Sequence, residues 1–147
     1  ISAARVVRLF GFDPKVAFVS HSTFGQPVTN RTKHIKKAVD ILKEKKVDFE
    51  FDGDMQPDVA LNKEYKNLYP FSNIVGNANI LIMPGQHSAA ISYKMMKELG
   101  DTKVIGPLLI GLGLPIEIAP LRTSTSELIN LPSIAAYSAD VIDYKKN

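Results

Sequence analysis

The stretch Gly106–Asn130, GPLLIGLGLPIEIAPLRTSTSELIN, predicts two strands followed by a polar loop and a helix. Two apolar runs, Leu108–Leu112 and Ile116–Ala119, flank the turn Gly113-Leu114-Pro115. Short apolar runs bounded by glycine and proline are typical of buried strands. The stretch therefore favours an α/β protein over an all-helical one.

The end of this stretch carries a helix-start signal. Ser124 and Glu127 have the spacing of a capping box, in which each side chain hydrogen-bonds a backbone amide of the first helical turn. Ligand sites of α/β proteins commonly lie where a strand leads into a helix. We therefore expect functional groups in the loop Pro120–Thr125.

Strands and helices alternate along the rest of the chain. Apolar runs predict further strands at Val16–Ser20, Phe49–Phe51 and Ile80–Met83. Periodicity and boundary signals predict helices at Ser2–Phe10, Arg31–Lys46, Pro57–Leu61, Ser88–Leu99 and Glu127–Val141. This order implies parallel pairing through right-handed crossovers, with helices on both faces of the sheet. We predict a three-layer α/β/α fold with a mostly parallel sheet, in which residues from about 1 to 120 form the core and those from about 121 to 147 a C-terminal helical segment.

Two segments interrupt this pattern. Pro132 lies inside the last predicted helix, where proline costs about 3 kcal/mol, so we expect a kink or a break there. Lys63–Asn77 has no clear period and is predicted to be irregular, with Lys63–Phe71 as the most plausible mobile part.

Composition narrows the class of function. The 147 residues suffice for one domain with a core, and 45% hydrophobic and 22% charged residues are ordinary for a globular protein. Neither membrane nor nucleic-acid partners are expected, because no apolar run is long enough to span a bilayer and the net charge is only +3. Absence of cysteine fits a cytoplasmic protein. The start at Ile1, without methionine, predicts a piece of a longer chain.

The loops that follow the predicted strands are expected to meet at one edge of the sheet. They are Ser20–Asn30, Asp52–Gln56, Pro84–Ser88 and Pro120–Thr125. Their hydroxyls, amides, histidines and helix-start N–H groups suit a phosphate or a carbonyl oxygen. The same residue types are also common turn formers and caps, which is the more frequent role.

Ser20-His21-Ser22-Thr23 contains a hydroxyl next to an imidazole. A nucleophilic serine needs its base within hydrogen-bond reach and a third group that orients the base. Neighbouring residues of a strand point to opposite faces, so we expect no pair between Ser20 and His21. Polar lining of a cleft is the favoured interpretation.

Asp52 and Asp54 lie two residues apart and can share one face of a strand. Such a pair can bind a metal or act as acid and base. Hydrogen bonding to turn and helix-start amides is the commoner role for aspartates in this setting. The three histidines show no metal-ligand spacing, so we expect no metal site.

Cations are concentrated in one predicted helix. Arg31–Lys46 carries seven of them, which can receive phosphates but more often form a solvated face. Tyr93 and Lys94 lie on the helix beside the expected crevice. They can reach a phosphate of an acyl-CoA, or the lysine can lie along apolar surface with its charge in water.

Several short motifs add a family resemblance. They are VSHSTFG at Val19–Gly25, DGDMQ at Asp52–Gln56, GNANIL at Gly76–Leu81, ISYK at Ile91–Lys94, Gly106-Pro107-Leu108 and Pro115-Ile116. In this order the chain resembles the C-terminal part of the phosphotransacetylase-like (phosphate acetyl/butyryltransferase) domain, and more closely the version fused to large NADP-dependent malic enzymes. The resemblance implies the C-terminal portion of an isocitrate/isopropylmalate dehydrogenase-like fold.

Phosphotransacetylases move an acetyl group between CoA and phosphate. In active members a Ser-Arg pair follows the Pro-Ile strand, and an aspartate lies in the first turn of the next helix. The resemblance places these positions at Pro120, Leu121 and Glu127, and a further family arginine at Glu98. It therefore implies a degenerate catalytic set. Arg122 lies one place from the expected arginine, so a one-residue shift of the loop can restore that charge.

The malic-enzyme-fused version has Pro-Leu in place of Ser-Arg. The resemblance therefore implies a regulatory domain that binds acetyl-CoA or a related acyl-CoA and self-associates as a homo-oligomer. Malate oxidation, NADP and a divalent metal would belong to an upstream domain. Ala90 stands where both versions often have asparagine. The implied ligand-binding residues are Ser20, Ser22, Thr23, Tyr93, Lys94, Arg122 and Thr123.

Two other functions stay open. The chain can belong to an active phosphate acetyltransferase with rearranged groups, in which Arg122, Thr123, Ser124 and Glu127 carry the chemistry. It can also be a scaffold that contributes mainly to subunit association, with a ligand site completed by another part of the protein.

Overall fold

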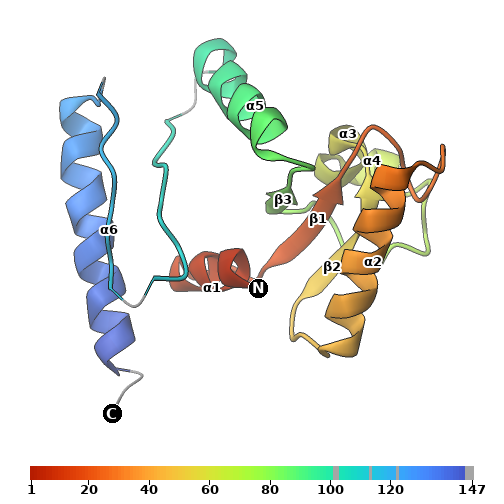
Figure 1. Cartoon of the computed structure of the whole chain (residues 1–147), viewed down its shortest axis with the longest axis horizontal. Coiled ribbons are helices and arrows are strands. Elements are labelled where there is room, and N and C mark those ends of the chain that lie inside the picture. The colour runs from red at the N-terminus through yellow and green to blue at the C-terminus, as the bar shows by residue number, and fades with distance from the viewer. Residues whose placement is uncertain (101–102, 113, 122, 145–147) are drawn as a thin grey trace. The chain divides into compact units, whose positions relative to one another are not determined.

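A computed structural model describes residues 1–100, 103–112, 114–121 and 123–144 of the chain (Figure 1). The chain divides into two compact units, one covering Ala3–Lys94 and the other beginning at Met95. The first contains a sheet and most of the helices, and the second contains an extended segment and the last helix.

A parallel three-stranded sheet forms the centre of the first unit (Figure 1). The strand β1 (Lys15–Val19) lies between β2 (Glu50–Met55) and β3 (Ile80–Ile82). All three strands are parallel, and they are joined through helical connections. This is the α/β arrangement that the alternating pattern predicted.

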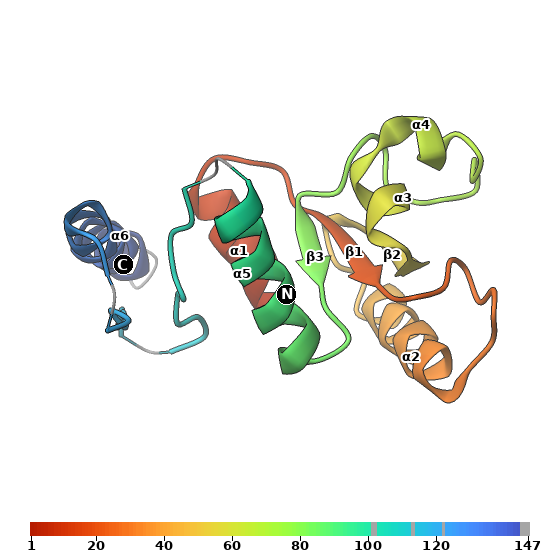
Figure 2. The same ribbon diagram turned by 90° about the horizontal axis from the view of Figure 1, so that it is seen from above.

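Helices cover both faces of the sheet. The helices of the described residues, in both units, are α1 (Ser2–Leu9), α2 (Asn30–Glu44), α3 (Pro57–Leu61), α4 (Lys63–Lys66), α5 (Gln86–Leu99) and α6 (Thr125–Tyr144). Figure 2 shows α2 and α3 on opposite sides of the strands. The three-layer prediction is therefore confirmed for the part of the chain that forms the sheet.

Two apolar clusters fill the spaces between the layers. On one face Ala17 and Val19 pack with Met55 and with Val59 and Ala60 of α3. On the other face the neighbouring strand residue Val16 packs with Ile80 and with Ala4 of α1. Because successive strand residues point to opposite faces, one short buried strand supplies both clusters.

The second strand is longer than the sequence predicted. We expected it to end at Phe51, but β2 continues through Asp52, Gly53 and Asp54 to Met55. The pairing shifts by one residue after Phe18, which is opposite Gly53, so that Val19 pairs with Met55. Aspartate is rare inside strands, but here both carboxylates receive hydrogen bonds, which removes the usual penalty.

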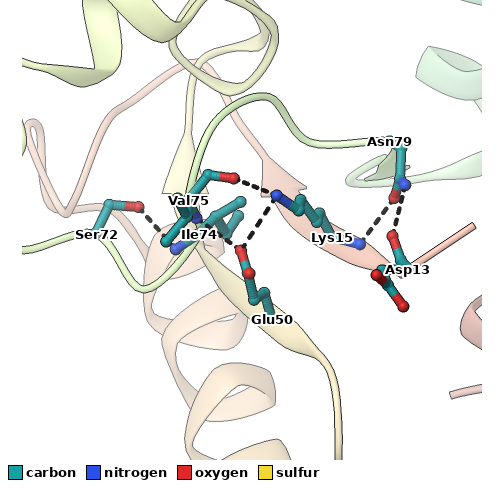
Figure 3. Close-up of polar contacts among 7 residues, drawn as sticks. All are labelled: Asp13, Lys15, Glu50, Ser72, Ile74, Val75 and Asn79. Atoms are coloured by element: carbon teal, nitrogen blue, oxygen red, sulfur yellow. Dashed lines mark hydrogen bonds and ion pairs between the residues drawn. The ribbon is translucent and has the colours of Figure 1, made fainter.

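The segment predicted to be irregular contains α4 and is then held by polar contacts to the amino ends of the strands (Figure 3). The ammonium of Lys15 donates to the carbonyl of Val75 at 2.5 Å and lies 3.9 Å from the Glu50 carboxylate. Glu50 also accepts from the Val75 amide at 2.6 Å, and Asn79 accepts from the Lys15 amide at 2.8 Å. Mobility of Lys63–Phe71 stays a prediction.

The two strands predicted in the second unit are not formed. Leu108 and Glu117 make a single antiparallel bridge, and the residues of both apolar runs are largely exposed, as for Ile110 and Ile116 at 45% and 49%. The expected turn residue Gly113 lies outside the described residues. An isolated two-stranded ribbon is marginal without a third strand or a packed face, which explains the extended but unpaired conformation.

The last helix, α6, continues through Pro132, so the helix does not break there, and a kink at this residue stays a prediction. Proline removes one backbone donor and crowds the preceding turn. The hydroxyl of Ser133 donates to the carbonyl of Ile129 at 2.8 Å, which keeps a hydrogen bond in this turn. None of the helices in the described part of the chain is long and apolar enough to cross a membrane.

We predict that Gly53→Ala destabilises the first unit by about 1–3 kcal/mol. A Cβ at this position would lie 2.7 Å from both the Cβ and the carbonyl oxygen of Phe18, and the φ of +151° is unfavourable for a side chain. Gly85→Ala is the matched control, because a Cβ there meets nothing within 4 Å. Urea unfolding followed by circular dichroism compares the two. Equal midpoints would contradict the close-approach argument.

Candidate functional site

The loop after β1 folds back over the end of β2. The amide of Ser20 donates to the Met55 carbonyl at 2.9 Å, and that of Phe24 donates to the Asp54 carbonyl at 2.6 Å. Thr23 and Gln26 then exchange backbone hydrogen bonds and close a turn. This loop therefore lies at the carboxyl edge of the sheet, where the sequence predicted a ligand site.

Three of the predicted ligand-binding residues lie in this loop and are buried. Ser20, Ser22 and Thr23 are 9%, 0% and 8% exposed. The Thr23 hydroxyl accepts from the Gln56 amide at 3.2 Å, and the Ser22 hydroxyl donates to the Asp54 carboxylate. In this structure they hold the loop onto the sheet, and direct ligand binding by them stays a prediction.

Ser20 and His21 are in contact, contrary to the sequence prediction. The Ser20 hydroxyl lies 3.3 Å from Nδ1 of His21 and 3.3 Å from the Ser22 hydroxyl. The prediction failed because β1 ends at Val19, so neither residue belongs to a strand and the alternation of faces does not apply.

The two aspartates have the structural role that the sequence favoured. Asp52 accepts from the Gly53 amide at 2.9 Å and from the Asn73 amide at 2.7 Å. Asp54 accepts from the Gly25 amide at 3.1 Å as well as from Ser22. The two carboxylates accept hydrogen bonds from different loops. Among the described residues no group of three or more acidic or histidine side chains is placed to hold a metal.

Sequence reasoning missed the partners of these carboxylates. Asn73 lies 21 residues from Asp52, and Gly25 lies 29 residues from Asp54. Both supply backbone amides, which carry no residue-type signal, and Asn73 adds its side-chain amide at 3.3 Å from Asp52. The glycine of the VSHSTFG motif is the one local hint, since its φ of +80° suits a turn that aims an amide inward.

The other predicted residues lie on α5 and in the extended segment. Tyr93 is 44% exposed and Lys94 is also exposed, on a helix without a single buried residue. The hydroxyl of Thr123 donates to the carbonyl of Pro120, so these two close a turn. Arg122 lies outside the described residues, and a restored arginine therefore stays a prediction.

The positions expected to be degenerate differ in their surroundings. Leu121 is fully exposed, and Pro120 and Glu98 are also exposed. Glu127 instead forms the predicted capping box with Ser124. Its carboxylate accepts from the Ser124 amide at 2.7 Å and from the Ser124 hydroxyl at 2.8 Å, while its own amide donates back at 3.3 Å.

This arrangement fixes the charge of Glu127. The Ser124 amide, the Ser124 hydroxyl and then the Lys97 ammonium at 3.2 Å stabilise the carboxylate and lower its pKa from 4.5 to about 2. Hydrogen bonds to the ionised form of an acid always act in this direction. Glu127 is thus a poor acceptor of protons at neutral pH.

A cavity of about 730 Å³ lies in the first unit but at the opposite edge of the sheet. It is lined by the amino ends of β1 and β2, the end of α2 and Arg8 of α1, and none of the predicted site residues reaches it. Arg8 is paired with Asp48 at 2.9 Å and Lys15 lies 3.9 Å from Glu50. The carbonyl end of α2 further disfavours an anion there.

Comparison with known proteins places these features in a family. The model of the phosphate acetyl/butaryl transferase family matches residues 1–136. The chain belongs to this family. The resemblance seen in the ordered motifs is confirmed.

Among its relatives, an NADP-dependent malic enzyme of Rhizobium meliloti is 48% identical over 137 residues, which are 93% of this chain and 18% of that protein. A phosphate acetyltransferase of Clostridium acetobutylicum is 34% identical over 95% of this chain and 42% of its own length. A phosphotransacetylase structure from Streptococcus pyogenes superposes with a TM-score of 0.87 at 31% identity, covering 94% of this chain and 42% of that one. The family member described here thus spans less than half of each relative.

We predict that Asp54→Ala destabilises the first unit by about 1–3 kcal/mol, because the buried Ser22 hydroxyl and the Gly25 amide lose their acceptor. Asp40→Ala is the control, since Asp40 is exposed on α2 and should change stability by less than about 0.5 kcal/mol. Urea midpoints measure both. Similar midpoints for the two variants would show that the carboxylate does not hold the loop.

We also predict that Ser124→Ala raises the pKa of Glu127 part of the way from about 2 toward 4.5, because the variant loses the Ser124 hydroxyl but keeps the Ser124 backbone amide, which is the larger cause of the shift, and Lys97. Because folding lowers this pKa, the stabilisation from Glu127 is complete above pH 4.5 and disappears as the pH falls toward 2. A ¹³C NMR titration of the side-chain carboxyl gives the value directly. Thr123→Ala is the matched control, since its hydroxyl bonds to Pro120. A pKa unmoved by Ser124→Ala would refute the hydrogen bond from the Ser124 hydroxyl to the carboxylate.

Proposed function

We propose that the chain is the acyl-CoA-binding, regulatory part of a larger NADP-dependent malic enzyme and that it does not transfer acetyl groups itself. The observation that carries this proposal is that the Glu127 carboxylate is already hydrogen-bonded to Ser124 and paired with Lys97. Family resemblance aligns this residue with the aspartate of active transferases. The higher identity to a malic enzyme, 48% against 34% for a phosphate acetyltransferase, supports the same choice.

These contacts bear on catalysis because acetyl transfer requires a group that accepts a proton. A general base must take the proton of the CoA thiol, whose ordinary pKa is about 8.5. With a pKa of about 2, the Glu127 carboxylate is a weaker base than an ordinary glutamate, whose pKa is about 4.5. Pro120 and Leu121 also offer neither a hydroxyl nor a charge to a tetrahedral oxyanion. Binding without turnover is what these residue types support.

Regulation requires that acetyl-CoA bind one state of the assembly more tightly than another, typically by 1–3 kcal/mol. The second unit supports self-association as a homo-oligomer, since Leu99, Leu114 and Leu121 are 81%, 71% and 106% exposed. Malate oxidation, NADP and a divalent metal would then belong to the part of the polypeptide that this chain does not cover. The cytoplasmic location expected from the sequence stays a prediction.

The test uses the intact polypeptide that carries this chain. We expect saturable acetyl-CoA binding in calorimetry, a change in the rate of malate oxidation on binding, and no acetyl phosphate from acetyl-CoA and phosphate. Lys94→Met should weaken binding severalfold, since an ion pair with a phosphate is lost. Lys33→Met, on the exposed face of α2, is the matched control. Acetyl phosphate formation that Glu127→Gln abolishes would establish the transferase instead.

A further inference from the structure

A chain of hydrogen bonds runs from the buried end of β2 to the surface. The Asp54 carboxylate accepts from the Ser22 hydroxyl, which lies 3.3 Å from the Ser20 hydroxyl, which in turn lies 3.3 Å from Nδ1 of His21. Asp54, Ser22 and Ser20 are 4%, 0% and 9% exposed, whereas His21 is exposed. The imidazole is thus the outer end of an otherwise buried chain.

The direction of these hydrogen bonds follows from the carboxylate. An ionised carboxylate only accepts, so Ser22 must donate its single proton to Asp54. Ser22 then accepts from Ser20, whose proton is used in that bond. Ser20 can only accept from its remaining neighbour, so Nδ1 of His21 must carry a proton.

The tautomer of the neutral imidazole is thereby set. With the proton on Nδ1, the other ring nitrogen, Nε2, has a free lone pair and acts as an acceptor. Nδ1 contacts the buried serine while the residue as a whole is exposed, which leaves Nε2 for a contact with a ligand. The backbone here is also held, since the amide of the Gln56 side chain donates to the His21 carbonyl at 2.9 Å.

We propose that His21 is a ligand-contacting residue that accepts a hydrogen bond from a donor group of the ligand, and that Asp54, Ser22 and Ser20 are its positioning residues. The identity of the ligand rests on the proposed function. In an acyl-CoA such donors are the two amides and the hydroxyl of the pantetheine arm, together with the adenine amino group and the ribose hydroxyl of the nucleotide half. The phosphates are acceptors and do not suit this nitrogen. We assign His21 to the pantetheine arm, and binding of the nucleotide half of CoA alone distinguishes this assignment from a contact with adenosine.

The tautomer is measured without any ligand. Solid-state ¹⁵N NMR of the intact polypeptide, labelled in histidine at a pH near 8 where free imidazole is neutral, reports which nitrogen is protonated. Subtracting the spectrum of His21→Gln isolates His21, and the exposed His34 on α2 is an internal control.

We expect a protonated Nδ1 in the wild type. In Ser22→Ala and, should that variant not fold, in Ser20→Ala, we expect the proton to return to Nε2, as in free imidazole. A wild-type proton on Nε2, or no change in either variant, overturns the positioning chain.

Ligand contact is measured separately, with acetyl-CoA and with adenosine 3′,5′-bisphosphate, the half of CoA that lacks pantetheine. His21→Leu should weaken acetyl-CoA binding about three- to tenfold, the effect of one hydrogen bond, and leave bisphosphate binding unchanged. His21→Gln keeps an acceptor and should lose less. Equal loss for both ligands, or no loss for acetyl-CoA, overturns the contact. Absence of acetyl-CoA binding to the wild type overturns the proposed function, while the NMR result still decides the positioning chain.

Discussion

Two buried carboxylates at the end of β2 must be supplied with donors, and the arrangement of the carboxyl edge follows from this requirement. Asp52 and Asp54 are 6% and 4% exposed. Leaving such groups unpaired would be far more unfavourable than ordering a loop to serve them. The loop after β1 therefore folds over Asp54, and the segment before β3 turns so that Asn73 meets Asp52. The polar side chains of this edge are thus held in place by hydrogen bonds within the protein.

Much of the fold followed from local patterns, because apolar runs and helix caps are properties of neighbouring residues. The buried run at β1, the lysine-rich α2 and the capping box of Ser124 were predicted on that basis. What failed depended on distant partners. β2 extends beyond Phe51 because loops far along the chain satisfy its aspartates. The apolar runs beyond Gly106 lack a packed face and stay unpaired. Within the site, the residue types were predicted but their burial was not, since exposure is set by the whole loop.

The proposed division between binding and catalysis rests on where hydrogen bonds are already used. At the carboxyl edge the hydroxyls of Ser22 and Thr23 are engaged within the protein, and His21 carries the outward-facing group. At the start of α6, the Glu127 carboxylate likewise already accepts two hydrogen bonds from Ser124. A ligand can use what is left exposed, while proton transfer needs a group free to change its protonation.

The capping box of Glu127 also has an evolutionary consequence. A variant lineage with a hydroxyl and a guanidinium in place of Pro120 and Leu121 would still have the Glu127 carboxylate hydrogen-bonded to Ser124 and paired with Lys97. Acetyl transfer would need at least one further substitution that frees the Glu127 carboxylate. That substitution would remove the capping box and so destabilise the start of α6. If the proposed function holds, such intermediate sequences would gain no activity, and the contacts of Glu127 with Ser124 and Lys97 would oppose the appearance of acetyl transfer.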